Sequence, residues 1–182
     1  MKKVFIFHGT WSSPEDFWFP YIKNNLSKEE FHVTIPNLPN ADNPELEECL
    51  KFLNQYNFDE ETIMVGHSSG CPLILSILER RKIHIARAIF VAWFSRPLWW
   101  EANPILQKSY KWEIIQKNCR NFYFINSLDD PWSCNEEEGE IFLKNLWWNL
   151  ILRTNEWHMG SKKFHQPYKE FPLLKSLIEL PL

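Results

Sequence analysis

No part of the sequence is apolar for long enough to cross a membrane as a helix, which takes about 20 residues. The apolar run at residues 4–7 is also shorter than the ~7–15 apolar residues at the centre of a secretory signal peptide. We therefore expect a cytoplasmic protein without stable membrane insertion.

An excess of charge of one sign is lacking as well. The 182 residues carry a formal net charge of −3, and acidic and basic residues are mixed along the chain. The one dense basic run, residues 80–82, falls at the end of an expected helix, where the helix dipole stabilises cations. Because nucleic acids require a concentrated basic surface, we expect no nucleic-acid partner. The sequence identifies no protein partner.

The sequence patterns that bind metals and cofactors are missing too. There is no H-E-x-x-H, no C-x-x-C pair, no G-x-G-x-x-G and no phosphate-binding glycine loop. The four cysteines, Cys49, Cys71, Cys119 and Cys134, are far apart in the sequence, and we predict that they are reduced and mostly buried thiols. We expect neither a metal nor a cofactor.

The chain does contain alternating strand and helix patterns, and its length suits one domain, residues 1–182. Apolar, β-branched runs predict strands at residues 3–7, 31–35, 62–65, 86–92, 121–125 and 148–153. Helical spacing predicts helices between them, including one that Asn43 caps and one that begins with a capping box of Asn135 and Glu138. This alternation favours a parallel α/β sheet with helices on both faces and a ligand site at the carboxyl ends of the strands.

The clearest chemical motif is Gly66-His67-Ser68-Ser69-Gly70, which lies between a predicted strand and a predicted helix. A G-x-S-x-G sequence in this setting forms a sharp turn that exposes the serine hydroxyl at the sheet edge. Glycines on both sides are needed because side chains there would collide with the bent backbone. Ser68 is therefore the candidate nucleophile.

A serine nucleophile needs a histidine base and an acid that orients the base. On an α/β-hydrolase-like sheet these residues follow the serine in the order acid, then histidine. Only His158 and His165 satisfy this order, and we favour His158 because it lies in the loop after the sixth predicted strand. Asp129 and Asp130 follow the fifth strand in a turn that Pro131 fixes; we choose Asp130, with Asp129 as the alternative.

Backbone N–H groups are expected to stabilise the developing oxyanion. One is that of Ser69, and the other comes from Thr10 or Trp11 in the loop after the first strand. Ten tryptophans and fourteen phenylalanines also suggest an aromatic-lined pocket. Trp11 is a candidate lining residue. The aperiodic residues 93–117 contain three further tryptophans that either shape this pocket or cover the sheet as core: Trp93, Trp99 and Trp100.

These motifs resemble those of the small serine hydrolases of the retinoblastoma-binding protein nine and YdeN family. The resemblance covers nearly the whole chain and rests on matches in order: His8-Gly9, residues 14–20, residues 66–70, Lys111-Trp112-Glu113-Ile114, residues 127–131 and Trp157-His158. It implies a single-domain α/β-hydrolase core, a three-layer sandwich of about six mostly parallel strands without a large cap domain. It also implies Ser68 as nucleophile, Asp130 as acid and His158 as base. Trp157 stands where the family usually has glycine, and no L-x-C-x-E sequence supports binding to retinoblastoma-type proteins.

The sequence thus predicts a serine hydrolase that cleaves an ester, thioester or amide of a small-molecule acyl substrate, with carboxylic esters favoured. Two alternatives stay open. In the first, the protein keeps the fold without activity and acts as a protein-interaction module, with the tryptophan-rich segment as its contact surface. In the second, the same residues transfer the acyl group to an acceptor other than water.

Overall fold

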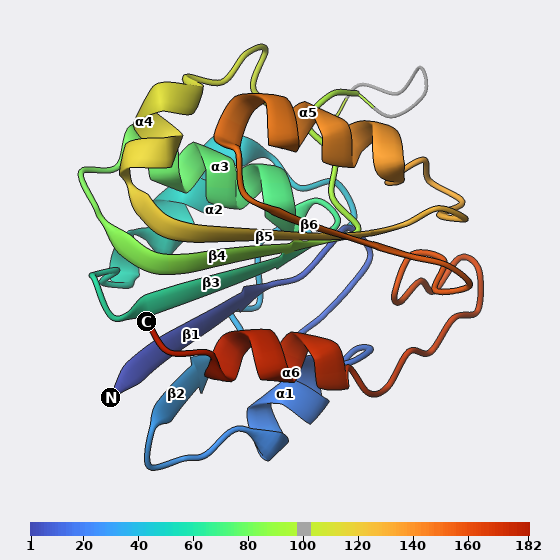
Figure 1. Ribbon diagram of the computed structural model, residues 1–182, viewed down its shortest axis with the longest axis horizontal. Helices are drawn as coiled ribbons and strands as arrows, with labels where there is room; N and C mark the ends of the chain where they lie inside the picture. Colours follow the sequence, from blue (N-terminus) through green and yellow to red (C-terminus); the bar gives the residue numbers. More distant parts are fainter. Residues whose placement is uncertain (98–102) are drawn as a thin grey trace.

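The computed structural model describes residues 1–97 and 103–182, which form one six-stranded sheet with helices on both faces (Figure 1). The strand order is β2-β1-β3-β4-β5-β6, and all five pairings are parallel. The strands are β1 (Lys2–Phe7), β2 (Phe31–Thr34), β3 (Thr62–His67), β4 (Ile85–Val91), β5 (Cys119–Ser127) and β6 (Asn149–Arg153). The predicted three-layer α/β fold is confirmed.

The helices are divided unequally between the two faces of the sheet (Figure 1). One face is covered by α1 (Phe19–Asn25) and α6 (Pro172–Glu179). The other face is covered by α2 (Leu46–Phe52) with the short 3-10 helix η1 (Leu53–Gln55), α3 (Gly70–Arg80), α4 (Trp112–Lys117) and α5 (Glu136–Leu146).

Alternation along the central strands separates two apolar layers. In β1, Phe5 and Phe7 face the core under α2 to α5, whereas Val4 and Ile6 face the core above α1 and α6. Successive side chains of a strand point to opposite faces, so a strand buried on both sides is apolar at most of its positions. This requirement explains the largely apolar runs from which the strands were predicted.

A buried cation joins α6 to the sheet. Arg87 in β4 is 1% exposed, and its guanidinium donates to the carbonyl oxygens of Leu177 (2.8 Å) and Pro181 (2.8 Å) at the end of α6. The last carbonyl groups of a helix lack intrahelical partners and carry the negative end of the dipole. Arg87 therefore satisfies these carbonyl groups and fixes the C-terminal helix against the sheet.

Two local expectations need correction, and one short helix was not expected. Asn43 does not cap a helix, because α2 begins three residues later, after an extended Glu45 without a side-chain cap. Asn135 does cap α5, but Glu138 turns away from it, so the capping box is incomplete. The aperiodic residues 93–117 contain a helix, α4, which is only six residues long and therefore too short to show a clear period.

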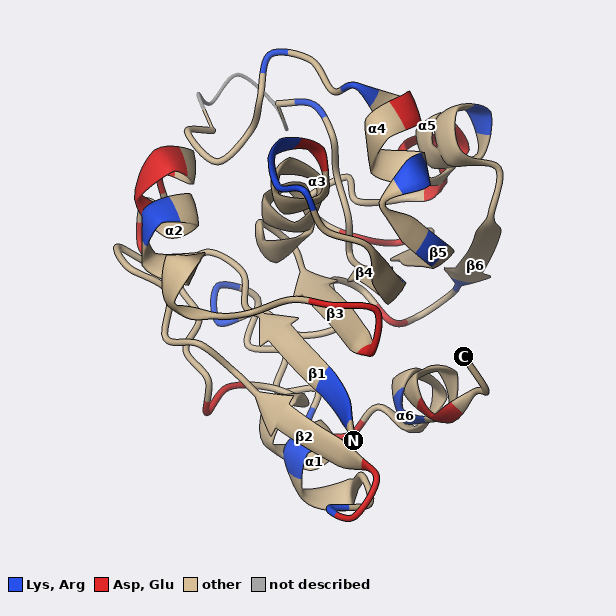
Figure 2. Ribbon diagram, turned by 90° about the vertical axis from the view of Figure 1, so that its left-hand side faces the viewer, with Lys and Arg blue, Asp and Glu red and all other residues tan. Residues whose placement is uncertain are grey.

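The described surface mixes charges of both signs, and Figure 2 shows acidic and basic segments interspersed over the helices and loops. Exposed ion pairs such as Arg80 with Glu47 and Arg120 with Glu60 bring opposite charges together. Among the described helices, none combines the length and the apolar character needed to span a bilayer.

Candidate active site

The candidate residues come from loops at one edge of the sheet. Thr10 follows β1, Ser68 follows β3, Asp130 lies three residues beyond β5, and His158 lies five residues beyond β6. Because all strands are parallel, their carboxyl ends share this edge. The order of strands also reverses at β1, next to β3, which is where open α/β sheets form ligand crevices.

Ser68 occupies a sharp turn between β3 and α3. Its φ angle is 51°, in the left-handed region that residues other than glycine rarely adopt. Its N–H donates to Val91 O (2.9 Å), and its carbonyl oxygen accepts from Cys71 N–H (2.9 Å). The turn is thus tied to β4 and to the first turn of α3, which holds a strained conformation that exposes the serine at the sheet edge.

Two glycines let the neighbouring backbone approach this turn. A Cβ atom on Gly70 would overlap the carbonyl group of Phe7 in β1, and one on Gly9 would lie 2.9 Å from Ser68 Cβ. Such contacts are too short for carbon atoms, and at Gly70 the obstacle is main chain, which a side-chain rotation cannot relieve. The glycines therefore allow the loop after β1 to pack directly on the serine turn.

His158 and Asp130 form a buried hydrogen-bonded pair. His158 Nδ1 lies 2.8 Å from Asp130 Oδ2, and the two residues are 5% and 8% exposed. The other carboxylate oxygen, Oδ1, accepts from the Trp132 N–H at 2.7 Å. With its carboxylate fixed in this way, Asp130 selects the Nδ1–H tautomer of His158 and leaves Nε2 with a free lone pair.

The other predicted candidates lie elsewhere. Asp129 is turned to solvent and accepts a hydrogen bond from the Ser127 hydroxyl, which lowers the pKa of the Asp129 carboxyl group. His165 is exposed and does not line the pocket described below. Of the two aspartates and two histidines that the sequence left open, the structure pairs only Asp130 with His158.

Buried hydrogen bonds hold the loop that carries His158. His67 Nε2 donates to the His158 carbonyl oxygen (3.0 Å), and the Trp18 indole N–H donates to the Met159 carbonyl oxygen (3.0 Å). Burial, together with the neighbouring His158, lowers the pKa of His67 to about 3, so His67 is neutral. Gln166 accepts from Gly160 N–H (3.0 Å) through its side chain and forms two backbone bonds with Ser161.

Sequence reasoning gave no role to these supporting residues. Trp18 lies within a family motif, but its partner is 141 positions away, and no local pattern reveals a contact of that range.

Trp157 has a backbone conformation that explains why glycine suits its position. Its φ angle is 48°, again in the left-handed region, and the residue is 46% exposed. Glycine adopts such φ values without a steric penalty. Trp157 is not among the residues that line the pocket, so its ring does not narrow the site in front of His158.

The two proposed oxyanion donors lie side by side. The Thr10 hydroxyl donates to Ser69 Oγ at 3.0 Å, which joins the loop after β1 to the serine turn. The Trp11 N–H is already used, because it donates to Ala41 O at 2.8 Å. Within the described residues, the N–H groups of Thr10 and Ser69 donate to no protein atom. Thr10 is therefore the better of the two candidates in this loop.

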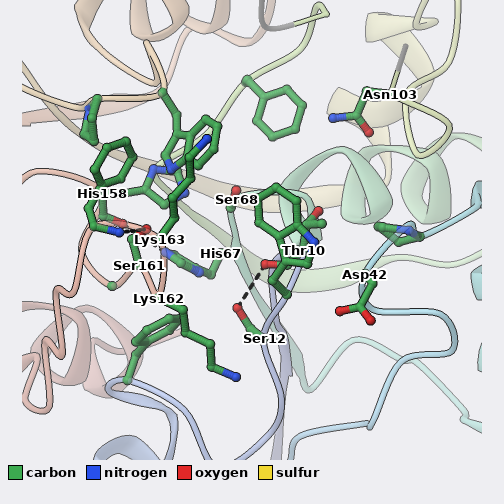
Figure 3. A pocket seen from close by; sticks show the side chains of 18 of the residues that line it. Thr10, Ser12, Asp42, His67, Ser68, Asn103, His158, Ser161, Lys162 and Lys163 are labelled. Carbon is green, nitrogen blue, oxygen red and sulfur yellow. Dashed lines mark hydrogen bonds between the residues drawn. The ribbon is translucent and has the colours of Figure 1, made fainter. Parts of the chain in front are cut away.

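A cavity of about 450 Å³ opens above Ser68 (Figure 3). Ser68, Thr10, His67 and His158 line it, together with aromatic side chains from four loops: Trp11, Phe17, Phe94, Trp132 and Phe164. Trp11, a candidate lining residue from the sequence, is among them. Ser68 and His158 share the cavity, although no hydrogen bond joins their side chains in the part of the chain that the structure describes.

Trp93 does not line this cavity. It is fully buried, its ring stacks on Phe142 at 3.4 Å between centroids, and its indole N–H donates to Glu138 O (3.1 Å). The structure therefore gives Trp93 the core role that the sequence also allowed. The other two predicted lining residues, Trp99 and Trp100, lie outside the described residues.

Sequence reasoning also missed a cluster of potential metal ligands. Asp130, Cys134 and His158 each place a donor atom within 4.8 Å of the others. Metal ligation requires a thiolate, but burial raises the pKa of Cys134 well above its usual value and keeps it a neutral thiol. Because Asp130 already bonds to His158 and to a backbone N–H, the cluster fits an acid–base pair beside a packed thiol better than a metal site.

A serine after the third strand, an acid after the fifth and a histidine after the sixth form the arrangement of the α/β hydrolases, and the fold places the chain in that class. Residues 4–176 match the family described as Serine hydrolase, and the chain belongs to this family. The resemblance seen in the sequence is thereby confirmed.

Individual relatives agree with this assignment. The chain is 33% identical over 135 residues to the putative hydrolase YdeN of Bacillus subtilis, covering 71% of each chain. It is 25% identical over 154 residues to the serine hydrolase RBBP9 of Rattus norvegicus, covering 82% of this chain and 81% of the relative. The crystal structure of the ydeN gene product from B. subtilis superposes with a TM-score of 0.86 at 25% identity, over 98% of this chain and 97% of the other.

Proposed function

We propose that the protein hydrolyses a carboxylic ester, or a related thioester or amide, through an acyl-enzyme on Ser68. The observation that carries this proposal is the 2.8 Å bond between His158 and Asp130 at the rim of the cavity that exposes Ser68. A serine hydroxyl is a poor nucleophile near neutral pH, and an oriented imidazole supplies the missing base.

In the first half of the reaction, Ser68 Oγ attacks the carbonyl carbon and its proton passes to His158 Nε2. The tetrahedral intermediate then collapses, the bond to the leaving group breaks, and His158 gives that proton to the departing oxygen, sulfur or nitrogen. In the second half, His158 takes a proton from water, which attacks the acyl-enzyme, and the carboxylic acid leaves as Ser68 is restored. Asp130 stabilises the imidazolium in both halves.

The backbone N–H groups of Thr10 and Ser69 stabilise the oxyanion in this proposal. Both lie at the edge where Ser68 is exposed, and the bond between their side chains fixes their separation. Donors that are preorganised in a water-poor site contribute more than the same donors in water, because they need no reorientation as charge develops. The serine–histidine bond of a resting hydrolase is often long and shortens when substrate binds.

Labelling with a fluorophosphonate probe tests the proposal directly. The wild-type protein should react, and Ser68→Ala and His158→Ala should lose labelling together with hydrolysis of short-chain nitrophenyl esters. Loss of the nucleophile is expected to reduce turnover by up to ~10⁶-fold. Ser161→Ala is the matched control, because Ser161 lines the same cavity but has no proposed part in the reaction, and it should label normally.

Equal labelling of the wild-type protein and Ser68→Ala would refute the nucleophile assignment. A folded wild-type protein that ignores both the probe and the esters, yet captures a specific partner, would support the interaction-module alternative. Adding alcohols or amines tests the acyltransferase alternative, because an acyltransferase would form new esters or amides at the expense of free acid.

A further inference from the structure

The cavity wall beside His158 combines aromatic rings with a cation. The Trp132 ring lies 6.3 Å from the His158 ring and 5.4 Å from the Phe164 ring, measured between centroids. The ammonium group of Lys163 lies over the Trp132 ring, 4.4 Å from its centroid. A cation held over an aromatic face in this way keeps a defined position without an acidic partner.

The two neighbouring lysines of this loop differ in charge balance. Lys162 forms an ion pair with Asp16 at 2.7 Å, so its charge is matched. Lys163 has no carboxylate within ion-pair distance among the described residues, although both lysines line the cavity. The positive charge of Lys163 is therefore available to a ligand in the cavity.

The direction of proton transfer identifies which part of a substrate meets this wall. In the proposed reaction His158 protonates the leaving group, so the leaving group must lie on the His158 side of Ser68. Figure 3 shows His158, Lys162 and Lys163 on one side of Ser68 and Asp42 on the other. The acyl part then extends toward Asp42, whose charge opposes an acyl chain that ends in an anion.

We propose that the wall formed by Trp132, Phe164 and Lys163 selects a flat, aromatic leaving group that bears an anion such as a carboxylate. This inference rests on the proposed function, because it depends on His158 being the group that protonates the leaving group. The ring packs against the wall that Trp132 and Phe164 form, and the anion meets the ammonium group of Lys163. The reaction releases the aromatic alcohol, thiol or amine with the proton from His158.

Three aryl esters test whether the anion must be on the leaving group or whether an anion anywhere in the substrate is enough. 4-Acetoxybenzoate carries the carboxylate on the leaving group, its methyl ester is the neutral match, and monophenyl succinate carries the carboxylate on the acyl group. Comparing kcat/KM of Lys163→Met with that of the wild-type protein for each ester cancels differences in intrinsic reactivity. Lys169→Met is the control, because Lys169 is exposed on the same segment and does not line the cavity.

Lys163→Met should reduce kcat/KM for 4-acetoxybenzoate by about 5-fold, the effect of one ion contact at about 4 Å in water. The methyl ester and monophenyl succinate should change by less than about 2-fold, and Lys169→Met should leave all three unchanged. The 5-fold effect should shrink at high salt, because salt screens an exposed charge. An equal loss for all three esters, or a loss for monophenyl succinate alone, overturns the inference.

Binding to an inactive protein gives a readout that does not depend on turnover. Ser68→Ala should bind 4-hydroxybenzoate more tightly than 4-hydroxybenzamide, measured by calorimetry, and Ser68→Ala with Lys163→Met should lose that preference. If no ester is hydrolysed but this preference is present, the proposed function fails while the anion site stands. If the two compounds bind equally well to Ser68→Ala, the inference fails whatever the activity.

Discussion

His67 should make the protein less stable as the pH falls from 7 toward 5. Burial, together with the neighbouring His158, lowers the pKa of His67 to about 3, whereas an unfolded histidine has a pKa of about 6.5. Between these values the unfolded chain binds a proton that the folded protein excludes. Protonation therefore favours unfolding, and stability is lost as pH falls below about 6.5.

The magnitude follows from the two pKa values. At pH 5, which lies about 1.5 units below the pKa of the unfolded histidine, His67 is protonated in the unfolded chain and still neutral in the folded protein. Each unit corresponds to about 1.36 kcal/mol, so His67 alone should cost about 2 kcal/mol at pH 5 and almost nothing at pH 8.

Urea unfolding at pH 8 and pH 5, followed by tryptophan fluorescence, measures this cost. Trp18 lies 5.9 Å from His67 between ring centroids and provides a signal close to the site. His67→Gln keeps a side-chain N–H donor but has no titrating group. Between pH 8 and pH 5 its free energy of unfolding should therefore fall by about 2 kcal/mol less than that of the wild-type protein. A pH dependence equal to that of the wild-type protein would show that His67 is protonated in the folded state and refute the reasoning. Burial also lowers the pKa of His8, but His8 is present in both proteins and cancels.

Two further predictions concern the site and its scaffold. Asp130→Asn should reduce kcat by roughly 10⁴-fold, because an amide favours the wrong tautomer of His158. Asp129→Asn should change kcat by less than about 10-fold. Measuring ester turnover of both variants decides which aspartate is the acid. Gly70→Ala should lower the free energy of unfolding by about 3 kcal/mol, since the new methyl group meets the main chain of Phe7. Gly139→Ala, whose methyl group meets only a movable side chain, should cost at most about 1 kcal/mol in the same denaturation assay.

The sequence by itself determined the sheet, because strands buried on both faces are apolar at most residues, and that pattern is visible in the chain. It also singled out Ser68, since a serine between two glycines after a strand has a local geometric meaning. The short helix α4 escaped prediction because six residues cannot establish a period. Glu138 matched a local capping pattern but instead accepts hydrogen bonds from Ser95 and Arg96, which are more than 40 positions away.

Only the tertiary structure shows which of Asp129 and Asp130 contacts His158. Adjacent aspartates in one turn are equivalent in sequence, but their side chains leave the backbone in different directions, and one of them meets His158. The sequence was equally silent on Lys163, which meets no carboxylate among the described residues, because only the fold shows which of the two lysines meets Asp16. Long-range contacts depend on how the loops fold over the sheet edge, and no local pattern records that.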